Sequence, residues 1–137
     1  MEKLFPNRRY RFHGPDRSFP VIASDEFNRE YRESARTGRV SFGNDRLFYR
    51  DLGKRYYCPY DFIERSFVRI SECQPDDSPA YYYYRVILVH GEKEFANLIF
   101  NEENDADYIV AHLKEINPEM EVGYVPPSDG KYRARFK

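Results

Sequence analysis

The chain contains no tryptophan and only two cysteines and two methionines, and it has no long run of apolar residues. Cys58 and Cys73 are too few for a disulfide framework and do not form a C-x-x-C pair, so we expect two reduced thiols. No apolar stretch approaches the ~18 residues that a membrane-spanning helix requires. The first residues also lack an apolar stretch followed by a small-residue cleavage site. We therefore expect no signal peptide and a cytoplasmic protein.

Motifs of the common catalytic and cofactor sites are missing as well. The 137 residues contain no Walker loop, no dinucleotide-binding glycine fingerprint and no nucleophile elbow. His13, His90 and His112 are spread over three segments, and the acidic run 101–107 lacks the glycine and the distal glutamate of a calcium-binding loop. We therefore expect that the protein is not an enzyme, with no catalytic residues, no metal site and no cofactor.

What the chain does contain is an excess of aromatic residues and arginine. There are 13 tyrosines and 11 phenylalanines, and such residues fit the half-buried surface of a β-sheet. Arginine is far more frequent than lysine, and beside tyrosine it favours guanidinium stacking or the recognition of anionic groups. The alternative is that the long arginine stems only cover exposed strand faces. Both interpretations remain open.

Charge is distributed unevenly along the chain. Residues 1–60 carry a net charge of +5, residues 61–130 carry -10, and residues 131–137 carry +4. The halves either pair within the fold or present two oppositely charged surfaces. Because nucleic-acid-binding domains are usually basic throughout, we expect no nucleic-acid partner. The arginine- and aromatic-rich segments 8–12 and 131–137 would suit single-stranded nucleic acid or an acidic partner, or they fold back as edge strands.

Two segments have the periodicity of amphipathic helices. Ser24 is a good N-cap for a helix over 25–36, and Gly38 follows as a C-terminal stop. The second helix is predicted over 104–117, with Asn101 or Asn104 as its cap and an acidic first turn. Its apolar residues recur at a spacing of 3.6, and we expect the stripe to be buried at Ile109, Leu113 and Ile116.

Between the two helices the pattern is that of consecutive antiparallel hairpins. Glycine-containing turns separate short runs of aromatic and β-branched residues, which predicts strands over 39–43, 46–51, 55–59, 66–73, 81–90 and 94–100. Pro59 has no backbone N–H, so the third strand is expected to end there or to lie at an edge. Between Phe62 and Cys73 the alternation of apolar and polar residues shifts by one position. This shift indicates either a strand with a bulge or a helical turn that leads into a strand.

This order of elements resembles bacterial pleckstrin-homology-like proteins of unassigned function. The resemblance rests on Gly38 to Gly43, Arg46 to Arg50, Tyr57 to Ile63 and the helix over 104–117. It implies an α+β, mostly β fold, in which an antiparallel β-sandwich or partly open barrel is capped by the C-terminal amphipathic helix. We therefore predict a single domain over 1–137. It comprises an N-terminal arm and short helix (1–38), a pleckstrin-homology-like core (39–117) and a C-terminal tail (118–137).

The tyrosine-rich strand over 81–90 provides the first candidate site. Consecutive strand residues point to opposite faces. Tyr82 and Tyr84 should therefore face the core. Tyr81, Tyr83 and Arg85 should lie together nearer the surface. Aromatic rings beside a guanidinium are typical of protein interfaces. We therefore expect a non-catalytic binding or scaffolding module that recognises a segment of a partner protein. The alternative is that the chain's own arm or tail covers these residues.

Arginines near the first hairpin provide the second candidate site. Arg39, Arg46 and Arg50 flank the turn Gly43-Asn44-Asp45, and arginine forks suit phosphate groups. The resemblance implies that such a site binds an anionic ligand or a lipid headgroup. This is the alternative function, and we expect no retention of the protein on lipid vesicles.

Overall fold

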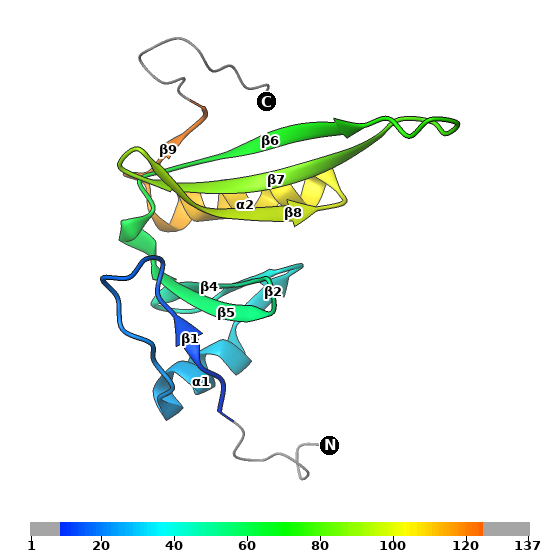
Figure 1. Cartoon of the computed structure of the whole chain (residues 1–137). Coiled ribbons are helices and arrows are strands. Elements are labelled where there is room, and N and C mark those ends of the chain that lie inside the picture. Colours follow the sequence, from blue (N-terminus) through cyan, green and yellow to red (C-terminus); the bar gives the residue numbers. More distant parts are fainter. Residues whose placement is uncertain (1–8, 125–137) are drawn as a thin grey trace. The chain divides into compact units, whose positions relative to one another are not determined.

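The computed structural model describes residues 9–124, which form two compact units separated in the sequence between Cys58 and Pro59 (Figure 1). This boundary lies inside the range 39–117 that we assign to one core from the sequence. Each unit contains one sheet and one α-helix, so the described chain is α+β and mostly β. Neither of these helices is long and apolar enough to cross a membrane.

The first unit is a five-stranded sheet with one helix. Its elements are β1 (Phe12–His13), α1 (Asp25–Glu33), β2 (Ala35–Thr37), β3 (Val40–Phe42), β4 (Arg46–Asp51) and β5 (Lys54–Pro59). The strand order is β1-β5-β4-β3-β2. β1 is an edge strand and pairs with β5 in parallel, whereas β2, β3 and β4 pair antiparallel. Phe12 and His13 therefore form an edge strand, which was one of the two possibilities for segment 8–12, whereas segment 131–137 lies outside the described residues.

α1 begins as predicted but ends earlier. The Ser24 hydroxyl accepts a hydrogen bond from the backbone N–H of Phe27, which caps the first turn. At the other end, the backbone N–H and the hydroxyl of Ser34 both donate to the Tyr31 carbonyl. Residues 35–37 then pair with β3, so the prediction of helix up to residue 36 is wrong there. Gly38, with a φ of 60°, serves the β2–β3 turn instead of the helix end.

The core of the first unit consists largely of aromatic rings. Phe12, Tyr31, Phe48 and Tyr57 are buried together, and neighbouring ring centroids lie 5.1–5.3 Å apart where Phe12, Tyr31 and Phe48 meet. These separations and the tilted or edge-on geometries are those that aromatic pairs prefer. Buried Asn28 fixes the arm to α1, because its side chain accepts from the Tyr10 N–H and donates to the Tyr10 carbonyl. The many tyrosines and phenylalanines thus build a core as well as a surface.

The second unit is a four-stranded sheet with a longer helix. Its elements are η2 (Tyr60–Phe62), β6 (Arg65–Cys73), β7 (Tyr81–His90), β8 (Lys93–Phe100), α2 (Glu103–Ile116) and β9 (Glu121–Val122), in the strand order β8-β7-β6-β9. β6, β7 and β8 are antiparallel, and β9 adds a short parallel pair with β6. The turn η2 before β6 accounts for the phase switch after Phe62.

α2 lies along the sheet of β6, β7 and β8 (Figure 1). One face of this sheet is almost entirely apolar, with Val68, Val86 and Leu98 buried. The apolar stripe of α2 is buried with it, at Ala106, Ile109, Val110 and Leu113. On the opposite face, Phe67, Ile87 and Val89 form a smaller cluster against Tyr124.

Two predictions about α2 are wrong in detail. Ile116 is 38% exposed, because the next inward position after Leu113 is occupied by Asn117. The Asn117 side-chain amide donates to the carbonyls of Tyr60 and Ile63 and so closes the end of the helix. The N-cap residue is Glu102, without a side-chain cap, and not an asparagine.

Candidate functional site

The residues Tyr81, Tyr83 and Arg85, here called the aromatic strip, share one face of β7, as their alternation requires. The β6–β7 pairing places Cys73, Ser71 and Arg69 opposite them on the same face. Tyr81 is 45% exposed, and Tyr83 and Arg85 are half-buried. The structure therefore brings the three predicted residues together beside one another on a partly open surface.

A small hydrogen-bond network orients the outer end of the strip. The Tyr83 hydroxyl donates to the Tyr81 hydroxyl at 3.2 Å, and the two rings pack edge to face with centroids 5.4 Å apart. Hydrogen bonds with the Cys73 thiol and then with Tyr83 raise the pKa of Tyr81 above its ordinary value. Tyr81 therefore presents a neutral hydroxyl as well as a ring, and the raised pKa extends this state to more alkaline pH.

The inner end of the strip is polar. Arg85 Nη1 donates to Asn97 Oδ1 at 3.4 Å, while Arg85 Nε is buried without a hydrogen-bond partner within residues 9–124. Arg69 pairs with Glu94 through two hydrogen bonds, the shorter of 2.8 Å, so this neighbouring guanidinium is neutralised. Arg85 is thus the arginine of the strip with hydrogen-bonding capacity to spare.

The end of the β6–β7 hairpin, which carries Tyr81 and Tyr83, extends past the end of β8 (Figure 1). The last β7–β8 pair is Tyr84 with Phe100, so residues 81–83 pair with β6 alone among the described strands. Tyr82 lies on the α2 side of β7 but is 47% exposed, because the hairpin ends beyond the apolar region. The prediction that Tyr82 faces the core is wrong for this reason, whereas Tyr84 is half-buried.

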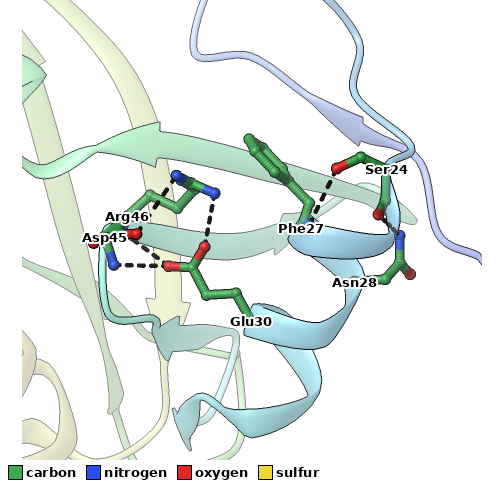
Figure 2. A network of polar contacts seen from close by, with 6 residues as sticks. All are labelled: Ser24, Phe27, Asn28, Glu30, Asp45 and Arg46. Atoms are coloured by element: carbon green, nitrogen blue, oxygen red, sulfur yellow. Dashed lines mark hydrogen bonds and ion pairs between the residues drawn. The ribbon is translucent and has the colours of Figure 1, made fainter.

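The three arginines of the second candidate site do not converge. Arg46 starts β4, whereas Arg50 is near its end, so their α-carbons are separated by roughly 13 Å at the usual rise per residue. Figure 2 shows that Arg46 is held by Glu30, with Nη1 at 2.7 Å from Oε1. The same carboxylate accepts from the backbone N–H groups of Asp45 and Arg46. The Arg46 guanidinium also lies 4.1 Å from the centroid of the Phe27 ring, so Arg46 is a structural residue of the first unit.

Arg39 and Arg50 do lie together, and two arginines that sequence patterns did not single out join them. Val40 pairs with Tyr49, which places Arg39 opposite Arg50. Arg55 lies on β5, across the β4–β5 turn from Arg50. Arg36 lies on β2 opposite Ser41, on the same face of the sheet and two residue pairs away from the pair of Arg39 and Arg50. The signal for Arg55 is the two-residue turn at Leu52–Gly53, because such a hairpin turn places Arg50 opposite Arg55. Arg36 falls in the segment that the sequence predicts as helix, so its place on the sheet follows only from the structure.

One further concave surface of the second unit is lined by both polar and apolar groups. A cavity of about 410 Å³ is bordered by Asp61, Ile63, Glu64, Arg65, Gly91, Asn117, Glu119, Met120 and Glu121. Three of its charged groups already serve the fold: Arg65 pairs with Glu121, and Glu64 accepts from the Gly91 N–H. Within residues 9–124 no group of three or more histidine, cysteine or acidic side chains is placed to hold a metal ion.

Comparisons with models of known protein families, with curated proteins and with solved structures gave no match to this chain.

Proposed function

We propose that the protein is a non-catalytic binding module whose second unit recognises an extended segment of a partner protein. The observation that carries this proposal is the uncovered edge of β7. β8 ends opposite Tyr84, and within the described residues no strand pairs with Tyr81, Tyr82 or Tyr83 on that side. Alternate backbone N–H and C=O groups at such an edge point outward and accept an added strand.

The side chains around this edge support recognition of a peptide. A partner peptide that pairs with Tyr81–Tyr83 as an added strand would take the position next to β7 that β8 leaves empty. Its side chains would lie beside the rings of the aromatic strip. Tyrosine supplies a large contact area at low cost in side-chain entropy, and it is enriched in interfaces. Ile99, 39% exposed on the same face at the sheet edge, adds an apolar contact. In this arrangement the backbone and the tyrosine rings both contribute to affinity, and the tyrosines also supply specificity.

Peptide selection followed by matched variants tests the proposal. Random peptides displayed on phage are selected against the full chain, and binding of the selected synthetic peptides is measured by fluorescence anisotropy. The double variant Tyr81→Ser/Tyr83→Ser should weaken binding by at least about tenfold, because buried aromatic anchors dominate such interfaces. Tyr82→Ser is the control, since Tyr82 is equally exposed on the opposite face.

Two results would contradict the proposal. One is unchanged affinity of a folded Tyr81→Ser/Tyr83→Ser variant, with folding checked by circular dichroism. The other is an equal loss in Tyr82→Ser, which would indicate a general effect of removing tyrosine from the hairpin. N-methylation of alternate peptide amides should also abolish binding if main-chain pairing contributes.

Two finer assignments belong to the same proposal. The succession of antiparallel hairpins followed by α2 supports a pleckstrin-homology-like relationship, for which the antiparallel sandwich is the expected form. Cys58 and Cys73 are not joined in a disulfide, which fits a reducing compartment such as the cytoplasm. Neither assignment requires a cofactor.

A further inference from the structure

Three arginines form a row in the first unit: Arg39 in the β2–β3 turn, Arg50 on β4 and Arg55 on β5. Arg39 and Arg50 lie opposite each other, and the Arg50 N–H donates to the Arg39 carbonyl at 2.9 Å. The turn between β4 and β5 consists of Leu52 and Gly53, both with positive φ, as in a two-residue hairpin turn. Such a turn aligns Arg50 with Arg55, and the stacked rings of the next pair, Tyr49 and Tyr56, agree with this register.

Neighbouring strands are about 4.8 Å apart, so the row spans roughly 10 Å. Like charges directly opposite each other destabilise a sheet. Within residues 9–124, no carboxylate lies within ion-pair distance of Arg36, Arg39, Arg50 or Arg55. Arg46, at the other end of the same sheet, is by contrast neutralised by Glu30. Glu30 thus neutralises Arg46, whereas the four arginines of this group have no carboxylate partner among the described residues.

Tyrosine rings hold two of the four guanidinium groups in position. The Arg55 guanidinium lies 3.7 Å from the centroid of the Tyr10 ring and 5.8 Å from that of Tyr31. Arg36 Nη2 donates to the Tyr31 hydroxyl at 3.0 Å, and Arg36 Nε lies 3.5 Å from Ser41 Oγ. Arg55 Nε is shielded from solvent and has no hydrogen-bond partner among the described residues. This pre-organisation reduces the entropy that a ligand must overcome.

We propose that Arg36, Arg39, Arg50 and Arg55, here called the arginine cluster, bind a ligand that carries two or more phosphate groups. Guanidinium groups donate paired hydrogen bonds that match phosphate oxygens, and several phosphates are needed to engage arginines spread over this distance. The exposed side chains of Arg36, Arg39 and Arg50 are accessible to such a ligand. The site lies on the first unit and does not depend on the peptide site of the second.

Isothermal titration calorimetry with inorganic tripolyphosphate tests the site on the full chain. The wild-type protein should bind, and added salt should weaken binding by screening. Arg39→Gln/Arg50→Gln removes two exposed guanidinium groups and should weaken binding by at least about tenfold, as expected for charged hydrogen bonds. Arg29→Gln is the control. It removes one exposed positive charge from the first unit, against two in the double variant, and Arg29 lies among Glu26, Glu33 and Asp45 instead of in the arginine cluster.

Three results would overturn the proposal: no binding by the wild-type chain, unchanged binding by a folded Arg39→Gln/Arg50→Gln variant, or an equal loss in Arg29→Gln. Two further measurements identify the source of the phosphate. Displacement of tripolyphosphate by a nucleoside triphosphate would support a soluble ligand, which we expect. Sedimentation with vesicles carrying a phosphorylated inositol lipid, lost in the double variant, would support a lipid headgroup at the same cluster.

Discussion

Glu30 on α1 should be one of the most sensitive residues of the first unit, although it is charged. Its carboxylate accepts hydrogen bonds from the Asp45 N–H at 2.8 Å, the Arg46 N–H at 3.2 Å and Arg46 Nη1 at 2.7 Å (Figure 2). The Glu30 and Arg46 side chains are only 9% and 18% exposed, so water replaces these bonds poorly. Hydrogen bonds to charged groups contribute about 1.5–3 kcal/mol each and are not additive. Glu30→Ala should therefore cost about 3 kcal/mol, near the cost of breaking a buried ion pair.

Urea unfolding followed by far-ultraviolet circular dichroism measures this cost. Glu33→Ala is the matched control on the same helix, because Glu33 is exposed and should change the free energy of unfolding by less than about 0.5 kcal/mol. A double-mutant cycle with Arg46→Met should give a coupling energy above about 1 kcal/mol. If Glu30→Ala and Glu33→Ala cost the same, or if the cycle shows no coupling, Arg46 is not a structural residue and its exclusion from the arginine cluster fails.

Further stability predictions concern both units. Leu113→Ala should lower the free energy of unfolding by about 2–5 kcal/mol, whereas Ile116→Ala should lower it by less than about 1 kcal/mol, because only Leu113 is fully buried. Gly43→Ala should destabilise by about 1–3 kcal/mol in the same urea assay, since the added carbon would lie 2.8 Å from the Arg46 carbonyl oxygen. Burial raises the pKa of Tyr49, so neutral Tyr49 favours folding fully below about pH 10 and stability falls above it. Tyr49→Phe should flatten that alkaline fall in melting temperature.

Local patterns in the sequence were enough to locate most of the regular structure. The hairpin of β7 and β8 consists of aromatic and β-branched runs on either side of a glycine turn, and its strands agree with the prediction to within one residue. α2 has a stripe at helical spacing that stops before Pro118, and its bounds likewise differ by one residue. Such elements are predictable because the interactions that define them join residues close in sequence. The sign change of the charge near residue 60 also nearly coincides with the boundary between the units.

The candidate sites show where local patterns were insufficient. Alternation along β7 placed Tyr81, Tyr83 and Arg85 on one face without any knowledge of the neighbouring strands. Exposure of Tyr82, however, depends on where β8 ends, and neutralisation of Arg46 depends on a carboxylate 16 residues away. Such contacts are set by the packing of whole elements against each other.

The sequence by itself determined the α+β, mostly β fold class, the main strands and helices, and the residues that share a strand face. Only the tertiary structure decided that the chain divides after Cys58, that β2 replaces the end of the predicted helix, and which arginines are neutralised. The physical reason is the range of the interactions. Periodicity and turn chemistry act over a few residues, whereas strand pairing and ion pairs join segments whose approach depends on the fold as a whole.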